Sequence, residues 1–181
     1  RLAESRMSAS PTAAYTIGAL RQTPIGPVSL AVGPLGLARV WFGQPEALAA
    51  QTGGQSGKSA ALEQALEQLR AYFSGSLRAF DLPLDLAGRS DFSLRVLRAC
   101  AAIPFGQTRS YAALAAESGS PGAARAVGTV MAANRLPIVI PCHRVLTSGG
   151  RLGGYSAPGG LESKTKLLAL EGIAIVNQRL A

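Results

Sequence analysis

The only histidine of the chain, His143, follows directly after Cys142, which is one of only two cysteines. A thiol acts as a nucleophile only as the thiolate, and a nearby imidazole is the side chain that most often takes its proton. The pair therefore predicts nucleophilic cysteine chemistry. The other cysteine, Cys100, lies on the apolar face of a predicted helix, and we interpret it as a core residue because unpaired cysteines are commonly buried.

The composition predicts a globular protein with a basic second half. Hydrophobic residues make up 48% and charged residues 15% of 181 residues, which is enough to bury a core in one or two small domains. Residues 1–87 carry seven basic and six acidic side chains, whereas residues 88–181 carry eleven and four. A basic half favours a polyanionic partner such as nucleic acid, although a basic surface kept for solubility is the alternative.

The cysteine count and the hydropathy indicate a reduced compartment. Two cysteines make no disulfide framework, and no secretory signal or membrane-length apolar run is present, so we expect a cytoplasmic, nucleoid-associated protein with no membrane contact. One histidine and two cysteines leave no four-ligand zinc site, and we predict neither metal nor cofactor. Residues 1–6 precede Met7; whether they belong to the natural chain stays open, and they are left out of the fold argument.

The first half predicts an α/β domain over residues 1–87 with a small antiparallel sheet. Residues 15–42 alternate apolar runs with Gly-Pro turns, which is typical of hairpins, and residues 44–58 predict a loop. Leu62, Leu66, Leu69 and Phe73 recur at helical spacing, so residues 59–73 predict a helix. Residues 80–86 alternate and predict either a strand or an extended linker, ahead of a boundary at 88–90.

The second half, residues 88–181, predicts a mainly helical domain that is helix-turn-helix or winged-helix-like. We expect Asp91 to cap one helix and Ser110 to cap a short helix that ends at 117. After a tight turn at 118–120, Ser120 should cap a further helix with Pro121 in its first position, running to 133. Asn134 is a plausible left-handed terminator of that helix.

The second helix of this pair consists mostly of small residues around one cation, Arg125. Small side chains allow a helix to approach another surface closely, and a long cation among them can enter a DNA groove. A tightly packed internal helix with Arg125 at its edge is the alternative. In a basic half-chain we favour the DNA interpretation.

Four blocks of sequence, in order, carry a resemblance to a known family. They are IPFG at 103–106 with TRSY at 108–111, AARAVG at 123–128, NRLPIVIPCHRV at 134–145, and a closing block of GYS at 154–156 with GGL at 159–161, Lys164, LLA at 167–169 and EG at 171–172. These blocks resemble the O6-alkylguanine-DNA alkyltransferases. The resemblance is strong over residues 92–172 and weaker before them, where TPIGP at 23–27 and YFSG at 72–75 still look familial.

The resemblance implies direct-reversal repair without a cofactor. Members bind double-stranded DNA from the minor groove, rotate the damaged guanine out of the stack, and move the alkyl group from O6 irreversibly to a cysteine of the protein. Flipping is required because a side chain cannot reach the target atom inside a duplex. We expect a monomer; cooperative binding along DNA and activity on O4-alkylthymine stay open.

By position, the resemblance assigns five residues to the chemistry. Cys142 would accept the alkyl group, and His143 would take the thiol proton through a bound water. Glu171 would orient the imidazole, following the logic of a catalytic triad. Tyr111 would donate its hydroxyl to N3 of the leaving guanine, and Asn134 would bridge the helix end to the active-site turn.

The remaining assignments concern DNA and the guanine pocket. Arg125 would fill the gap in the DNA stack. The other predicted DNA contacts are Tyr111, Ser93, Ser120, Ala124 and Ser148. The predicted pocket residues are Met131, Pro137, Val145, Tyr155 and Ser156. We interpret Arg144 as structural or DNA-facing, not catalytic.

The chain also departs from the family pattern. Residues 155–160 form a longer segment than the common form, which leaves pocket size and alkyl preference open. Ala112 stands where some members carry a polar residue. A related non-catalytic group lacks the acceptor cysteine. The presence of Cys142 argues against membership of that group. The cysteine-rich zinc module that some members carry upstream is missing from this sequence.

Two other functions remain as alternatives. The first is a helix-turn-helix module that recognises DNA and whose Pro-Cys-His turn is only structural. The second is a cysteine hydrolase or transferase that turns over with Cys142 and His143. The weakest step of the argument from residues alone is geometry, because residues adjacent in a chain need not have side chains that face each other.

Overall fold

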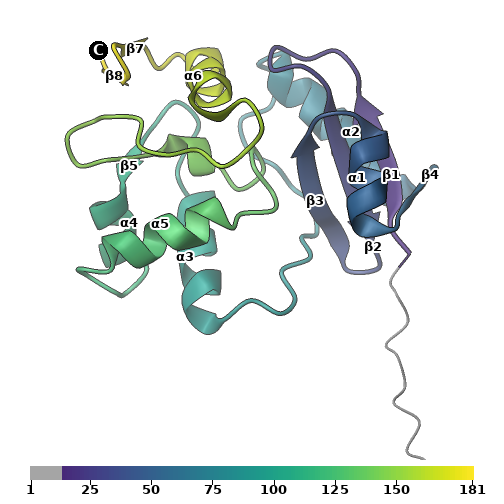
Figure 1. The fold of residues 1–181 in the computed structure, drawn as a ribbon, viewed down its shortest axis with the longest axis horizontal. Coiled ribbons are helices and arrows are strands. Elements are labelled where there is room, and N and C mark those ends of the chain that lie inside the picture. Colours follow the sequence, from purple (N-terminus) through teal and green to yellow (C-terminus); the bar gives the residue numbers. More distant parts are fainter. Residues whose placement is uncertain (1–13) are drawn as a thin grey trace, which may run out of the picture.

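The computed structural model describes residues 14–181, so the question about residues 1–6 lies outside the described residues. Two lobes lie side by side (Figure 1). One contains a small sheet with helices, and the other is mainly helical with short strand pairs. The predicted fold class is therefore confirmed.

The first lobe is built on a four-stranded sheet in the order β3-β2-β1-β4. Strands β1 (Thr16–Leu20), β2 (Val28–Gly33) and β3 (Gly36–Phe42) form the antiparallel meander that the Gly-Pro turns predicted. A short strand, β4 (Gln55–Ser56), runs parallel to β1.

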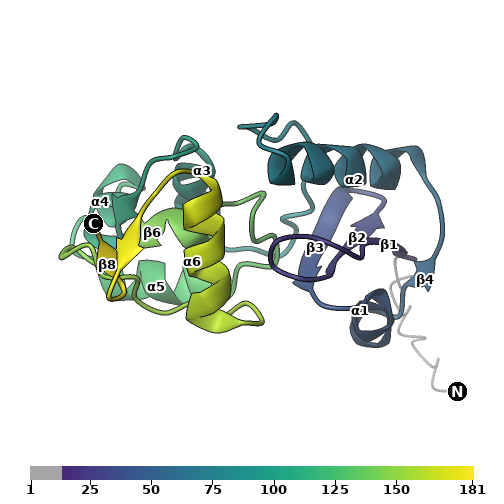
Figure 2. The ribbon, with the colours of Figure 1, turned by 90° about the horizontal axis from the view of Figure 1, so that it is seen from above.

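Two helices cover opposite faces of this sheet (Figure 2). Helix α2 (Ala60–Phe73) has the predicted bounds, because Ser59 caps it and its apolar stripe packs on the sheet. The predicted loop at 44–58 is wrong, since it contains α1 (Pro45–Thr52). A proline in the first turn, the burial of Leu48 and a left-handed Gly53 at the end favour that helix.

The segment at 80–86 is an extended linker that follows the edge of the sheet. The carbonyl of Pro83 accepts a hydrogen bond from Leu37, whose own carbonyl accepts one from Asp85, at 2.8 and 2.9 Å. The linker therefore covers part of the exposed edge of β3, which would otherwise present unpaired backbone groups.

The second lobe contains the predicted helical pair. Helices α3 (Asp91–Ala101), α4 (Tyr111–Glu117) and α5 (Ala124–Ala132) pack together, and α6 (Gly160–Leu170) lies beside the active-site turn. The short strands pair as β5 (Arg109–Ser110) with β6 (Val145–Leu146), and as β7 (Ile175–Val176) with β8 (Arg179–Leu180).

Three local predictions in this lobe need correction. Ser90, rather than Asp91, caps α3, because its hydroxyl accepts from the amide of Ser93. Helix α5 begins at 124 instead of just after Ser120, since Gly122 has a φ of +86° and keeps 120–123 in a turn. Asn134 is not left-handed; the side chain bonds the following turn instead.

The two lobes share one hydrophobic core. Residues of β2, β3 and α2 belong to the same buried cluster as residues of α3, α4 and α5. The amide of Val40 on β3 also donates to the carbonyl of Arg135, at 2.8 Å. A division at 87/88 stays a prediction. Among the described residues, no helix is long and apolar enough to cross a bilayer.

Candidate active site

The acceptor candidate, Cys142, begins a single 3₁₀ turn, Cys142–Arg144, after Pro141. The β-branched run before it is a chain of tight turns, in which the amide of Cys142 donates to the carbonyl of Ile140. Ile138 has a φ of +74°, which is costly for a β-branched residue and is tolerated here because the side chain is fully packed. Backbone strain thus lies four residues before the thiol.

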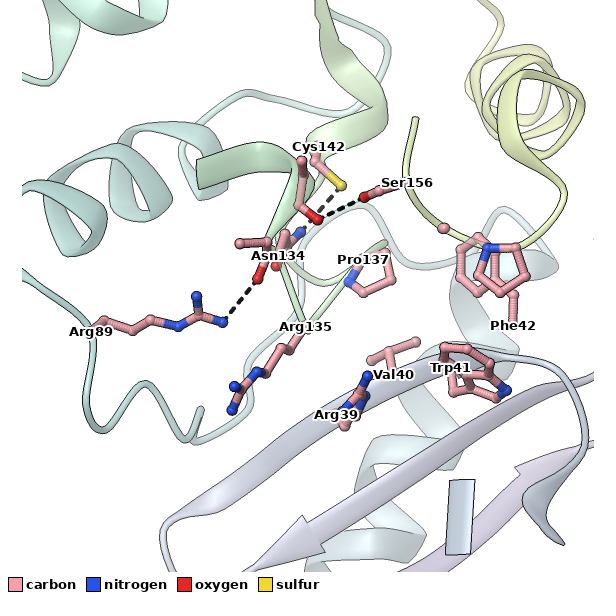
Figure 3. Close-up of a pocket in the computed structure, with 14 residues that line it drawn as sticks. Arg39, Val40, Trp41, Phe42, Arg89, Asn134, Arg135, Pro137, Cys142 and Ser156 are labelled. Atoms are coloured by element: carbon pink, nitrogen blue, oxygen red, sulfur yellow. Dashed lines mark hydrogen bonds between the residues drawn. The ribbon is translucent and has the colours of Figure 1, made fainter. Parts of the chain in front are cut away.

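Asn134 lies between the end of α5 and the Cys142 turn (Figure 3). Its amide nitrogen donates to the carbonyl of Ile140 at 2.9 Å and contacts the Cys142 sulfur at 3.2 Å. Its amide oxygen accepts from the amide of Leu136 at 3.0 Å. The side chain therefore links the end of α5 to the active-site turn and also contacts the sulfur.

His143 is completely buried and is held by one carboxylate. Its Nε2 lies 2.7 Å from Oε1 of Glu171, just after α6. Burial lowers the pKa of His143, although the hydrogen bond and charge of Glu171 act in the opposite direction. The imidazole is consequently neutral near pH 7, the form that can accept a proton.

Glu171 collects donors from several segments of both lobes. Arg144 donates to both carboxylate oxygens at 2.8 and 2.9 Å, the hydroxyl of Tyr72 donates at 2.8 Å, and the amide of Gly106 donates at 3.1 Å. Burial alone would raise the pKa of Glu171, but the hydrogen bonds from His143 and Arg144 hold it at about 2. This carboxylate stays ionised at any working pH.

The imidazole does not hydrogen-bond the thiol directly. Nδ1 of His143 is buried and has no hydrogen-bond partner among the described residues. Burial raises the pKa of the Cys142 thiol, and the hydrogen bond from Asn134 only partly opposes it. The resting sulfur is therefore a neutral thiol, and its proton needs a bridging carrier to reach His143.

A buried ammonium fixes the loop that faces the thiol. Lys164 on α6 donates to the carbonyls of Val145 and Leu152 at 2.7 and 2.5 Å, and to that of Gly154 at 3.4 Å. Burial lowers its pKa to about 8. The contacts tie the segment that leads into Tyr155 to the active-site turn, and they occupy the carbonyl of Val145, a predicted pocket residue.

One cavity of about 280 Å³ opens onto Cys142 from the helix-turn-helix side. Tyr111 from the start of α4, Met131 from α5, and Tyr155 with Ser156 from the following loop line its wall. The structure thus brings most of the predicted chemistry and pocket residues together around the thiol. Val145, which is fully buried, does not line this cavity.

A second cavity of about 320 Å³ reaches Cys142 from the side of the sheet (Figure 3). Pro137, a predicted pocket residue, lines this cavity together with residues 39–42 of β3. Ala157 and Pro158, which belong to the longer segment noted in the sequence, also line it. The departure from the family pattern therefore lies at a cavity wall.

A shallow groove beside the first cavity gathers most of the predicted DNA contacts. Tyr111, Ala124, the exposed Arg125 and Ser148 line it. Ser93 and Ser120 do not: Ser93 accepts from the Ser90 hydroxyl at the start of α3, and Ser120 lies in the turn before α5. Besides Tyr111, the groove carries the exposed cation Arg125 and otherwise small side chains.

Sequence reasoning left the role of Arg144 open and gave Tyr72 and Lys164 none. Arg144 is buried against Glu171, so its structural interpretation is right and the DNA-facing one is wrong. Tyr72 and Lys164 had no assigned role, although the Tyr-Phe-Ser-Gly run and the closing block contain them. Over residues 14–181, no group of three or more His, Cys, Asp or Glu could hold a metal.

Fold and site together define a class of protein. A buried cysteine with a histidine–glutamate pair lies at the foot of a cavity, next to a helix-turn-helix surface that carries an exposed arginine. Residues 91–173 match the family described as 6-O-methylguanine DNA methyltransferase, DNA binding domain, and residues 16–86 match its ribonuclease-like domain. The chain belongs to the 6-O-methylguanine DNA methyltransferase family.

Similar proteins and a solved structure support this membership, and their matches cover different shares of the chain. A methylated-DNA–protein-cysteine methyltransferase of Methanosarcina barkeri is 41% identical over 83% of this chain and 93% of its own length. The one of Mycolicibacterium paratuberculosis is 55% identical over 59% of this chain, and the match spans 63% of the relative, less than two thirds. The crystal structure of Mycobacterium tuberculosis OGT in complex with DNA is 40% identical, covers 87% of this chain and 93% of that one, and has a TM-score of 0.74.

Proposed function

We propose that the protein repairs O6-alkylguanine in double-stranded DNA by moving the alkyl group to Cys142 in a single turnover. The observation that carries the proposal is the arrangement around the thiol: a cavity on one side, the Asn134 amide at 3.2 Å, and the buried His143–Glu171 pair behind it. The relatives' name, methylated-DNA–protein-cysteine methyltransferase, describes the same transfer.

The proton of the thiol leaves through a water. Nδ1 of His143 is a buried acceptor without a partner among residues 14–181, and a water between it and the sulfur would satisfy both. Glu171 and Arg144 keep the other ring nitrogen protonated and the ring fixed. The sulfur then attacks the alkyl carbon, the bond from carbon to O6 breaks, and guanine leaves with the proton that the thiol has lost.

The leaving base is stabilised from the other wall of the cavity. Tyr111 is half-buried, and burial raises its pKa, so its hydroxyl remains a donor. We assign it the hydrogen bond to N3 of guanine, where negative charge develops as the bond to O6 breaks. Asn134 acts as a positioning residue through the turn, and Met131, Tyr155 and Ser156 bound the base.

The DNA partner would dock on the α4–α5 face from the minor groove. Arg125 projects from α5 between small residues, and we assign it the position left by the flipped guanine. Ala124, Tyr111 and Ser148 would contact the strand beside it. Ser93 and Ser120 stay proposed backbone contacts at the helix ends. We further propose a monomer, with residues 1–87 and 88–181 as its domains, acting at the nucleoid in the cytoplasm.

Intact-protein mass spectrometry with peptide mapping tests the function directly. The protein is mixed with a duplex that contains one O6-methylguanine, and Cys142→Ser serves as the control that should bind DNA without transfer. We expect one methyl increment per chain, on the peptide that contains Cys142.

Each alternative has its own outcome. Unchanged mass with the duplex still bound would make the protein a recognition module. Methyl loss from DNA that continues beyond one equivalent would indicate a cysteine enzyme that turns over. Transfer by Cys142→Ser would overturn the acceptor assignment.

A further inference from the structure

The last strands of the chain fold back onto the loop that follows the active-site turn. Strands β7 and β8 are joined by a two-residue turn in which both φ angles are positive, +50° and +61°, as in tight hairpins. The amide of Leu180 donates to the carbonyl of Gly150 at 2.9 Å, and the carbonyl of Gln178 accepts a hydrogen bond from the loop at 3.0 Å. Residues 150–152 and 175–180 therefore form one small three-stranded unit, which we call the wing.

The two faces of the wing differ in character. Arg179 lies directly opposite Val176 on β7 and directly opposite Arg151 on the loop, in antiparallel pairings on both sides. Directly opposite residues of antiparallel strands share a face of the sheet, so these three side chains form a row, and all three are exposed. Their neighbours Leu152 and Ile175 pack in an apolar cluster instead. The row is therefore the solvent side of the wing.

The two arginines of the row lack compensating charge. Like charges directly opposite each other in a sheet are destabilising. Neither Arg151 nor Arg179 forms an ion pair with a carboxylate of residues 14–181. The sequence offers none nearby, since residues 145–161 and 172–181 contain no acidic side chain. Guanidinium groups bind phosphate oxygens in a forked geometry, so the pair favours a phosphate-bearing polyanion.

The wing is continuous with the groove that the proposed function assigns to DNA. Thr147 and Ser148 precede the loop strand of the wing, Gly153 and Gly154 follow it, and all four line the groove. Thr147 also closes the loop, because its amide donates to the carbonyl of Arg151 at 3.0 Å and its hydroxyl accepts from the Arg151 amide at 3.1 Å. The guanidinium groups are thus carried by an ordered unit that begins and ends at the groove.

The position of the hairpin fits a contact outside the groove. In both views of the ribbon, β8 lies at the end of the helical lobe that is farthest from the sheet lobe (Figures 1 and 2). A duplex is longer than the groove, so its backbone continues past the residues that surround the flipped base. The wing is the next surface along the same loop.

We propose that the wing is a second DNA contact, in which Arg151 and Arg179 bind backbone phosphates of the duplex beside the groove. The inference rests on the proposed function, because it extends the DNA surface of the α4–α5 face. Phosphate contacts carry no sequence information and fix the orientation of the protein on the duplex. The wing therefore acts on damaged and undamaged DNA alike, and it holds the duplex while Arg125 meets the base stack.

The salt dependence of DNA binding tests this contact. The association constant for an undamaged duplex is measured at several salt concentrations for the wild type, Arg151→Gln, Arg179→Gln and the double variant. Each phosphate contact that is lost makes the plot of log K against log salt less steep by about 0.9. Arg70→Gln, which changes an exposed arginine on α2 of the sheet lobe, is the charge-matched control. Arg179→Lys keeps the charge on the wing.

We expect each single variant to reduce the steepness by about 0.9 and the double variant by about 1.8. The affinity should fall roughly two- to fivefold for each arginine, as for an exposed ion pair. Arg179→Lys and Arg70→Gln should keep the wild-type slope. An unchanged slope in the double variant would overturn the proposal, even with weaker binding. An equal reduction in Arg70→Gln would overturn it too, because it would indicate a general effect of net charge.

Uncharged phosphates then locate the contact. Cys142→Ser is bound to duplexes that contain one O6-methylguanine and a single methylphosphonate at successive backbone positions. At a contacted phosphate, the methylphosphonate should weaken binding by Cys142→Ser and should have no further effect once Arg179→Gln is added. Independent effects at every position for both Arg179→Gln and Arg151→Gln would contradict a direct contact.

Methyl transfer separates this inference from the function on which it rests. If wild-type protein transfers methyl to Cys142 and the salt slope is independent of Arg151 and Arg179, only the wing assignment is wrong. If wild-type protein binds the damaged duplex and transfers no methyl group, the proposed function itself is wrong, whatever the slopes.

Discussion

Tyr72→Phe tests whether the sheet lobe contributes to the chemistry or only supports it. The hydroxyl of Tyr72, on α2, donates to Oε1 of Glu171 at 2.8 Å, and the side chain is fully buried. Burial and the negative charge of Glu171 raise the pKa of Tyr72 far above its usual value, so the hydroxyl stays a donor throughout the working pH range. Phenylalanine keeps the ring packing and removes only this bond.

The expected loss of stability follows from the type of bond. A hydrogen bond to a charged group contributes about 1.5–3 kcal/mol. Glu171 keeps its contacts with His143, Arg144 and the Gly106 amide, so we expect the lower end, about 1.5 kcal/mol. For a chain of this size that corresponds to a shift in Tm of about 3–6 °C.

The pH dependence of the stability of Tyr72→Phe gives an independent test of the same bond. The pKa of Glu171 is depressed from 4.5 to about 2, so its contribution to stability is present above pH 4.5 and is lost as the pH falls toward 2. With one donor removed, the carboxylate protonates at higher pH. The midpoint of acid unfolding should therefore move upward in the variant.

Urea unfolding measures the change, with Tyr15→Phe, which alters a half-buried tyrosine of the same lobe, as the control. We expect a lower midpoint and an unchanged m-value for Tyr72→Phe. Transfer to Cys142 should slow by about tenfold or less, because the His143–Glu171 bond persists. A loss below about 0.5 kcal/mol, or one equal to the loss in Tyr15→Phe, would refute the assigned bond.

Three further predictions concern individual side chains. Burial lowers the pKa of His143, so the acid limb of the transfer rate should have its midpoint below pH 6.5, and a midpoint above that value would contradict a neutral buried base. The pKa of Lys164 falls from 10.5 to about 8 on folding, so between pH 8 and 10.5 only the unfolded chain holds the proton. In this pH range the free energy of unfolding should rise with pH in the wild type relative to Lys164→Met. Parallel pH profiles of urea unfolding for the two proteins would exclude the shift. Arg125→Ala should weaken repair of a duplex and leave transfer from the free O6-alkylguanine base nearly intact, whereas equal loss on both would refute an inserted finger.

Local patterns predicted the elements that local forces determine. The meander at 16–42 and helix α2 depend on turn residues and on one apolar stripe, and both formed with nearly the expected bounds. The missed helix α1 is different. Its sequence has hardly any amphipathic pattern, and the burial of Leu48 against Ile17 and Ala31 of the sheet stabilises it. Tertiary packing decided a segment whose composition alone indicated a loop.

The part of the site formed by residues close together in the sequence was predictable. Cys142, His143 and Asn134 lie within ten residues of each other, and their turn is a local structure. The partners of Glu171 are not local: Tyr72 precedes it by 99 residues and Gly106 by 65. No periodicity predicts which tyrosine hydroxyl will be buried next to which carboxylate, because that depends on how the two lobes pack.

This convergence explains why the buried charges around Glu171 are tolerated. Arg144 and Glu171 would be costly to bury separately, and an ion pair repays that cost only when the remaining donors and acceptors are satisfied. Here Tyr72, Gly106 and His143 donate hydrogen bonds that satisfy the remaining acceptor positions of the Glu171 carboxylate. Nδ1 of His143, the ring nitrogen that faces away from the carboxylate, is left without a partner in the part of the chain that the structure describes. Because Nε2 is bonded to Glu171, Nδ1 is the ring nitrogen that can accept a proton. The imidazole can therefore take the thiol proton on this side only.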